Sequence, residues 1–440
     1  MSSSDAGPGR PERSGRTDLW AHADFLRLWS AQAISAIGSR ITRTALPIIA
    51  IQTLSQTETS VALLWSLYLV PGLVLALFAG GFVDRSRKRH ILIASDLVRA
   101  ACVASISVAW LLGVLTMTQL IIVGALVGGA SALFTIADVA YLPTLVGRRL
   151  IAEGNAKLGA TEGVAEISGP AGAGVLIGIL GAPLAVAIDA ASYLWSALML
   201  GRIKSPEPPP QPLPSAESST WQTTRDLRSG VRAVFGHPHV RPIALGFIVW
   251  SVCGGFFTSL YALFCLRTLG LSALTFGIIV AVGGVGSLAG ALISRRLVTR
   301  IGLGPTMIVA AIVSTVTALL IPLARGPQWF AIGCLAGHQL ISDCFAVAFV
   351  IQATTLRQTV LPRQLLGRAN AVIHLCTTAP VPIAALAAGV LAEMTSIRTA
   401  VWVGMAIGLA VPPLLLPLRK LRGMPEPSSS STDLTLPLST

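Results

Sequence analysis

Charged residues are scarce in this chain of 440 residues: only 12% are Asp, Glu, Lys or Arg, whereas 53% are hydrophobic. Soluble globular proteins carry charges on about a quarter of their residues, so this class is excluded. Acidic residues are the scarcer kind, with 19 Asp and Glu against 32 Lys and Arg. The basic residues lie between apolar runs and form no single patch. The composition therefore predicts contact with anionic membrane lipids and no nucleic-acid partner.

Paired cysteines and phosphate-binding loops are also missing. None of the six cysteines lies in a Cys-x-x-Cys pair, and all six fall inside apolar runs. This pattern argues against disulfides, a metal site or any bound cofactor. No Gly-x-x-x-x-Gly-Lys-Ser/Thr loop occurs, which disfavours a nucleotide-driven pump. Residues 1–23 lack an apolar stretch, so we expect a disordered cytoplasmic tail there and not a cleavable signal peptide.

Apolar segments are what the chain has in abundance, each near the roughly 20 residues that a membrane-spanning helix needs. They predict an all-α membrane protein with twelve transmembrane helices, at about 25–51, 61–82, 90–113, 119–146, 157–180, 183–203, 242–266, 272–294, 303–324, 328–350, 366–391 and 398–418. The Pro-rich, polar stretch from Ser205 to Trp221 is typical of a linker between two six-helix halves. Thr224 to Phe235 then predicts a basic amphipathic helix on the inner membrane surface.

The expected organisation follows from these segments. It comprises a disordered tail over 1–23, a six-helix half over 24–203, a cytoplasmic linker with an amphipathic helix over 204–241, a second six-helix half over 242–419 and a disordered tail over 420–440. Basic loops stay in the cytoplasm. With the amino terminus inside, the outer connections contain only Arg267, Arg325 and Arg398 of all the arginines and lysines. Both termini are therefore predicted to be cytoplasmic.

Short motifs repeat between the halves at an offset of a little over two hundred residues. Gly80-x-x-x-Asp84-Arg85 recurs as Gly290-x-x-x-Ser294-Arg295, and Leu142-Pro143 with Asn155-Ala156 recurs as Leu361-Pro362 with Asn370-Ala371. Three matches in the same order predict two pseudo-symmetric halves. Parallel six-helix repeats with a binding site between them are a transporter architecture.

The most specific motif is a loop between the second and third segments. It reads Gly-Gly-Phe-Val-Asp-Arg-Ser-Arg-Lys-Arg over residues 80–89 and resembles the loop between helices two and three of the major facilitator superfamily of secondary transporters. The chain has Arg87 where that family usually has glycine. The resemblance implies a conformational gating loop made by Gly80, Asp84, Arg85, Lys88 and Arg89. The alternative is a stop-transfer cluster with no further role.

Two further runs extend the resemblance. Residues 169–174 read Gly-Pro-Ala-Gly-Ala-Gly and are similar to the Gly-Pro signature in helix five of the superfamily's antiporters, with Gly169, Pro170 and Gly174 as the motif residues. The alternative is small-residue packing between helices. The run 138–143, Asp-Val-Ala-Tyr-Leu-Pro, is similar to a bacterial branch that includes siderophore (enterobactin-type) and macrolide exporters.

The resemblance implies the major facilitator fold and a function in efflux. The expected protein is a monomer in the bacterial inner membrane that exports a small amphiphilic compound, such as an antibiotic, a drug or a siderophore-like metabolite. The expected mechanism is proton antiport with alternating access.

Ionisable residues at lipid depth are rare and costly, so each is a functional candidate. The proton or substrate candidates are Arg40, Arg43, Asp138, Glu162, Glu166 and Asp343. Glu162 and Glu166 are four residues apart on one predicted helix and therefore share a face.

Glu166 leads our hypothesis for the proton or cationic-substrate site, with Arg40 or Arg43 as its compensating cation. The estimated depths of these arginines leave direct contact with Glu166 open. The alternative for Glu166 is a packing hydrogen bond, in which case Asp138 or Asp343 is the coupling acid.

Two other functions stay open at this point. A proton-coupled or facilitative importer of a small metabolite fits the same topology. A polytopic membrane enzyme would place acid, base or metal-binding residues in loops at a membrane face. The outer loops here are short and nearly devoid of His, Asp and Glu, so we expect a protein that is not an enzyme. Its predicted partners are a small-molecule substrate, protons and membrane lipids.

Overall fold

The computed structural model describes residues 19–207 and 228–421, apart from the side chains of residues 76–81, 84, 148 and 363. Throughout these ranges the regular structure is helical, with no strand. The first half contains α1 (Ala23–Ile48), α2 (Glu58–Asp84), α3 (Lys88–Leu111), α4 (Met117–Leu180) and α5 (Ala182–Gly201), with the short η1 (Leu19–Ala21) and the π-helix η2 (Ile49–Thr53). Gly147 divides α4 into two spans, because its φ of 72° is a left-handed conformation that glycine adopts readily.

The second half follows the same plan with more interruptions. It contains α7 (Val240–Leu263), η4 (Phe264–Thr268), α8 (Ala273–Ile301), α9 (Leu303–Ala318), α10 (Leu320–Leu323), α11 (Gln328–Val360), α12 (Arg363–Thr378), α13 (Pro380–Met394), α14 (Ile397–Gly408), α15 (Val411–Leu414) and η5 (Leu416–Lys420). Within the described residues, twelve helical stretches are long and apolar enough to cross a membrane. The predicted all-α, twelve-helix membrane fold is therefore confirmed.

Several spans are longer than their apolar segments. The fifth begins at Arg149, where the sequence predicted a start near 157, and the tenth continues to Val360, past the predicted end near 350. Hydropathy detects only the part of a helix that suits lipid, whereas backbone hydrogen bonding continues into a polar end. Residues 228–235 are also helical. The rest of the predicted amphipathic helix, residues 224–227, lies outside the described residues, as do residues 1–18 and 422–440 of the predicted tails.

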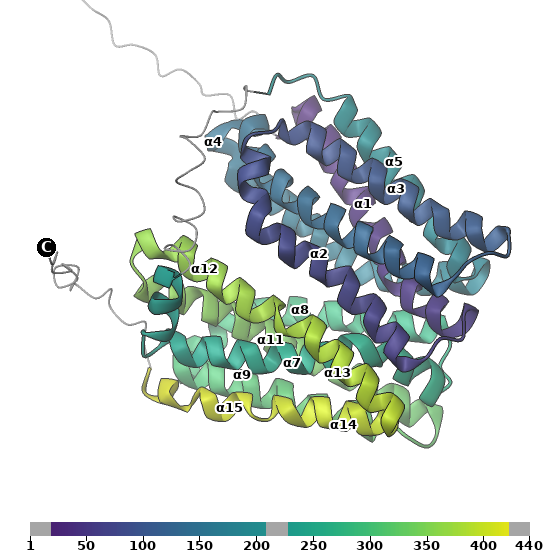
Figure 1. Ribbon diagram of the computed structural model, residues 1–440. Helices are drawn as coiled ribbons and strands as arrows, with labels where there is room; N and C mark the ends of the chain where they lie inside the picture. Colours follow the sequence, from purple (N-terminus) through teal and green to yellow (C-terminus); the bar gives the residue numbers. More distant parts are fainter. Residues whose placement is uncertain (1–18, 208–227, 422–440) are drawn as a thin grey trace, which may run out of the picture.

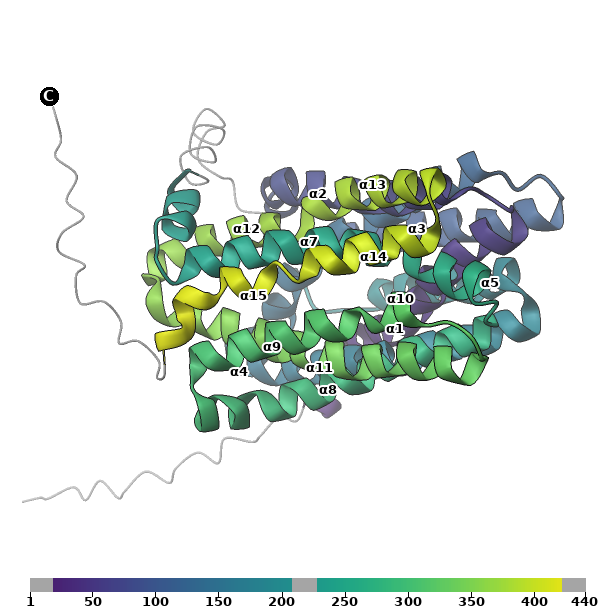
Figure 2. The same cartoon turned by 90° about the horizontal axis from the view of Figure 1, so that it is seen from below.

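The helices pack into two bundles. In the first, α1 packs on α4 and α5, and α3 packs on the same two helices; in the second, α11 packs on α8 and α9, and α7 on α13 and α14. The bundles touch mainly through α4 with α8 and α2 with α13. They converge at one end and separate towards the other (Figure 1). The view from below has the second half in front of the first, with α13 beside α2 (Figure 2).

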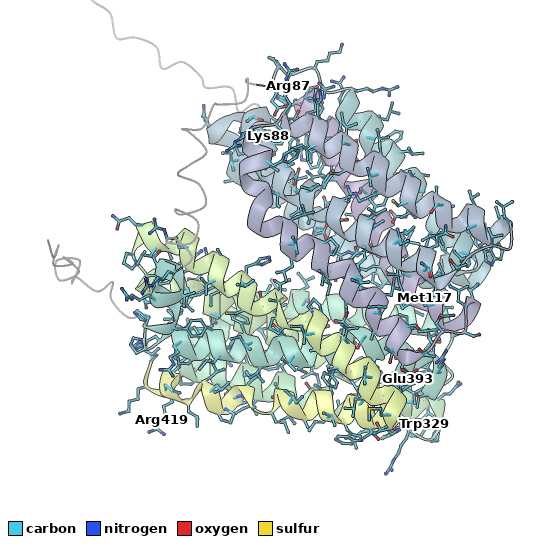
Figure 3. All side chains as sticks on the ribbon, viewed as in Figure 1. Arg87, Lys88, Met117, Trp329, Glu393 and Arg419 are labelled. Atoms are coloured by element: carbon cyan, nitrogen blue, oxygen red, sulfur yellow. The ribbon has the colours of Figure 1, made fainter. Side chains whose placement is uncertain are left out.

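The two ends of the molecule differ in their side chains. Arg87, Lys88 and Arg419 lie at the end where the bundles separate, whereas Glu393 and Trp329 lie at the end where they converge (Figure 3). At the converging end, the Arg267 Nη1 lies 3.0 Å from the Glu58 Oε1 of the other half. Thr59 donates a hydrogen bond to Glu393, which also joins the halves. We call this end the closed end.

Glycines allow the close approach of the bundles. A Cβ added to Gly174 on α4 would lie 2.9 Å from the Ala273 carbonyl oxygen on α8, and Gly277 faces Pro170 and Gly174 in return. Gly389 on α13 lies against Ala62 on α2 in the same way. Because water is absent from the lipid phase, such small-residue contacts are a main source of helix association there.

Candidate functional site

Two adjoining cavities share part of their lining, one between the bundles and one within the first half. One, of about 400 Å³, is lined from both halves, with Arg43 and Glu166 on one side and Phe257, Tyr261 and Gln339 on the other. The second, of about 740 Å³, lies within the first half, between α1, α2, α3 and α4. Arg40, Arg43 and Tyr68 line both. We call the two together the central cavity.

Arg40 is the centre of the charged groups in this cavity. Its Nη2 lies 2.6 Å from the Glu166 Oε2 and also forms an ion pair with Glu162. The two glutamates, predicted to share a helix face, are thus held by one guanidinium. Gly169 lies directly beside the Arg40 side-chain carbons, where a Cβ would clash. The side chain of Arg40 is only 11% exposed, so it is fixed between α1 and α4.

Arg43 is one helical turn further along α1 and is less firmly held. Its Nη2 lies 3.9 Å from the Glu166 Oε1, which is beyond hydrogen-bond distance. The Arg43 side chain is 47% exposed, compared with 11% for Arg40. The structure therefore brings both predicted arginines to Glu166, with Arg40 as the close partner.

The other two acidic candidates lie apart from this cluster. Asp138 accepts a hydrogen bond from Gln32 and lines the part of the central cavity within the first half. Asp343 on α11 lies beside Gly283 and Gln339. It lines a smaller cavity of about 120 Å³ in the second half, together with His338. Neither aspartate forms an ion pair within the described chain.

The loop at residues 80–89 is attached to the start of the predicted linker. Helix α2 ends at Asp84, and α3 begins at Lys88. The Glu207 carboxylate accepts hydrogen bonds from the backbone N–H groups of Lys88, at 2.6 Å, and Arg89, at 3.3 Å. A carboxylate at a helix amino terminus pairs with free N–H groups and with the helix dipole.

Arg89 adds a second attachment of the same loop, because its Nε donates to the Leu200 carbonyl oxygen at 2.8 Å. Arg85 is exposed, and the side chain of Asp84 lies outside the described residues. The gating role of Gly80, Asp84 and Arg85 stays a prediction.

The helix-five motif faces the second half. Pro170 lines the central cavity, and its carbonyl oxygen lies against Gly277. Gly169 makes room for Arg40, and Gly174 for α8. Small-residue packing therefore accounts for both glycines, and the same packing places the motif between the cavity and the closed end.

Sequence reasoning missed a buried ion pair on α3. Arg99 and Asp96 form it, and the Arg99 guanidinium carbon lies 4.4 Å from the ring centroids of both Phe134 and Tyr193. Such stacking stabilises a desolvated cation. The sequence does contain a signal for this pair, namely two opposite charges three residues apart in an apolar segment. Glu166 was identified on the same ground, that ionisable residues at lipid depth are rare and costly.

Asp189 has a structural environment. The residue is fully buried on α5 and accepts hydrogen bonds from Thr42 and Ser192. The sequence offered no means to place the aromatic residues Trp65 and Tyr68 at the central cavity, since they lie in an apolar run with no charge or motif to mark them.

Comparisons with known proteins agree with this geometry. The model of the Major Facilitator Superfamily matches residues 28–360. The enterobactin exporter EntS of Shigella dysenteriae is 27% identical over 428 residues, covering 94% of this chain and 97% of that protein. A bacterial homologue of the iron transporter ferroportin in an inward-facing state superposes with a TM-score of 0.71, at 16% identity over 92% of this chain and 100% of that one. The same kind of homologue in an outward-facing state gives 0.56, at 18% identity over 90% and 99% of the two chains.

Proposed function

Because this chain belongs to the Major Facilitator Superfamily and has its transporter fold, we propose that it exports a small amphiphilic compound in exchange for protons. The observation that carries the proposal is the central cavity, which combines one ion-paired cluster with an aromatic lining. Cavities of about 300–1,000 Å³ with apolar walls and few polar groups are typical of small-molecule sites.

The lining of the cavity supports an amphiphilic substrate. Trp65 and Tyr68 contribute aromatic rings from α2, and Phe257, Tyr261 and Phe276 contribute them from the second half. The Phe257 and Tyr261 rings stack with centroids 4.4 Å apart. A ligand with ring systems and a polar group gains apolar burial and ion-pair contacts at the same site. The likeness to an enterobactin exporter supports export of a siderophore-like metabolite, drug or antibiotic.

The orientation of the chain sets the direction of access. Basic loops face the cytoplasm, so the separated end with Arg87, Lys88 and Arg419 is proposed to be cytoplasmic, together with both termini. The central cavity is then accessible from inside a bacterial inner membrane, and the closed end faces outward. Rocking of the two halves about the cavity would break the Glu58–Arg267 and Thr59–Glu393 contacts and open the outer side.

Proton exchange is proposed to use the Arg40–Glu166 pair. Protonation of Glu166 removes its negative charge and releases it from Arg40, so the pair has two states that differ in the charge of the cavity. The pair joins α1 to α4 at the cavity wall, and α4 contacts the second half. Protonation of Glu166 therefore acts on both the bound substrate and α4.

Accumulation of a compound panel in cells tests this proposal. Cells with and without the protein are loaded with dyes, antibiotics and siderophore-like compounds, in the presence and absence of a protonophore. We expect lower accumulation of at least one amphiphilic compound in cells that contain the protein, and loss of the difference with the protonophore. Higher accumulation would identify an importer, and protonophore-insensitive efflux would contradict proton coupling.

A further inference from the structure

We infer that the exported compound carries an anionic group on an aromatic framework, and that Arg43 binds this group. The inference rests on the proposed function for one point, that the central cavity is where the substrate binds. To the proposed function it adds the sign of the substrate's charge and the residue that recognises the charged group.

The first argument is the distribution of ion pairs in the cavity. Where the two parts of the cavity adjoin, the charged cluster consists of two arginines and two glutamates, and Arg40 is in close contact with both carboxylates. Arg99 and Asp138 line the part within the first half. The Arg43 Nη2 lies 3.9 Å from the Glu166 Oε1, and the Arg43 side chain donates no hydrogen bond to any part of the described chain. A guanidinium has five N–H donors, and a planar carboxylate or phenolate matches its geometry.

The position of Arg43 makes this donor set available to a ligand. Arg43 lines both parts of the central cavity, and its side chain is 47% exposed there. The Trp65 and Tyr68 rings meet edge to face with centroids 5.8 Å apart. A half-exposed guanidinium that makes no hydrogen bond within the described chain, beside an aromatic wall, points to an aromatic ligand that supplies acceptor oxygens.

The acidic groups of the region do not favour a cationic ligand. Glu166 is held by Arg40, so a cation would have to displace an ion pair that is already formed. Asp138 accepts from Gln32 in the first half, and Asp343 lies beside Gly283 in the smaller cavity of the second half. A cation next to Glu166 would also lie beside Arg43, and like charges at that separation repel. An anion on Arg43 would lie near Glu166, but Arg40 already offsets the charge of that carboxylate, and no existing ion pair has to be displaced.

Binding of a matched dye pair to the purified full-length protein tests the inference. Fluorescein is anionic and rhodamine 123 is cationic at neutral pH, and both share the xanthene ring system. Fluorescence anisotropy in detergent micelles, with empty micelles as the blank, gives the dissociation constants. The variants are Arg43→Gln, Arg43→Lys and the control Arg325→Gln, which removes one positive charge from an exposed loop residue.

We expect the parent to bind fluorescein more tightly than rhodamine 123, and Arg43→Gln to weaken fluorescein binding by at least about tenfold, the effect of losing a charge-assisted hydrogen bond. Arg43→Lys keeps the charge but loses the planar donor geometry, so its affinity should lie between those of the parent and Arg43→Gln, and Arg325→Gln should match the parent. Rhodamine 123 binding should stay the same or become tighter in Arg43→Gln. Size-exclusion profiles confirm that each variant is folded.

Three results would overturn the inference: no fluorescein binding by the parent, an unchanged fluorescein affinity in Arg43→Gln, or an equal loss of both dyes in that variant. Because the assay measures equilibrium binding, its outcome is separate from transport. A protein that binds fluorescein through Arg43 and exports no compound from cells would contradict only the proposed export.

Discussion

Arg40 organises the charges of the cavity because, among the described residues, it is the one side chain that forms ion pairs with both glutamates of the cluster. An unpaired ion at lipid depth is costly, so the three groups stabilise one another only while at least one carboxylate is ionised. The position of Glu166 next to both cavity arginines makes it the group whose protonation most directly changes the charge seen by a substrate.

The substitution Glu166→Gln tests the proton role of this residue. Glutamine keeps the shape and the hydrogen bonding but cannot ionise, so we expect pH-driven uphill efflux to fall at least about tenfold at normal protein levels. The control is Glu153→Gln on the same span, since Glu153 pairs with Lys157 at 3.0 Å, away from the cluster. If Glu166→Gln pumps like the parent from about pH 6 to about pH 8, the coupling acid is Asp138 or Asp343 and Glu166 is a packing residue.

Sequence patterns predicted part of this site and not the rest. The spacing of Glu162 and Glu166 was enough to place both on one helix face, because helical geometry is local. Their contact with Arg40 depends on the rotation of α1 against α4, which is set by the missing side chain at Gly169 and by packing along the whole helix. Such long-range geometry, like the placement of Trp65 and Tyr68 at the cavity, leaves no periodic signal in a sequence.

At the scale of elements, the contact between α4 and α8 holds the closed end together. Gly174 meets the Ala273 carbonyl and the Leu274 backbone, whereas nothing lies within 4 Å of a Cβ at Gly178, one turn further along. The twelve spans were predictable because each must be apolar over about 20 residues, whereas their polar extensions, such as α11 up to Val360, were not.

Gly174→Val should push α4 and α8 apart at this contact. The added carbons would overlap the α8 backbone, so we expect the closed end to open and the outward-open population to rise. Electron–electron distances between spin labels on cysteines introduced at Gln52 and Met394, in a background without the native cysteines, report the separation of the halves there. Gly178→Val is the matched control and should leave the distances unchanged. An unchanged distance distribution in Gly174→Val would contradict the role of this contact.

The loop between α2 and α3 supplies a second test at this scale. A carboxylate at Asp84, the last residue of α2, is unfavourable for the dipole of its own helix. A favourable partner would be the amino terminus of a helix in the other half, reached when the halves rock. Asp84→Asn should therefore lower transport at least about tenfold and leave membrane insertion and dye binding intact. Normal transport by this variant would favour a stop-transfer role; Ser86→Ala serves as the loop control.

For the whole molecule, the proposed topology follows from the distribution of arginine and lysine. Reporter fusions after Arg89, Arg225 and Arg422 should all indicate the cytoplasm, and a fusion near Gln56 should indicate the outside, because basic connections are retained inside. An outside signal after Arg225 would contradict the arrangement of two six-helix halves joined by a cytoplasmic linker.

Proton-driven export is the central claim of the account, and transport by inside-out membrane vesicles tests it most directly. In these vesicles the cytoplasmic face is outside, and respiration acidifies the lumen. A compound identified in the cell panel should accumulate in the lumen against its gradient, and a protonophore or the Glu166→Gln substitution should abolish the accumulation. Accumulation that persists after complete collapse of the proton gradient, or that occurs only in right-side-out vesicles, would contradict the account.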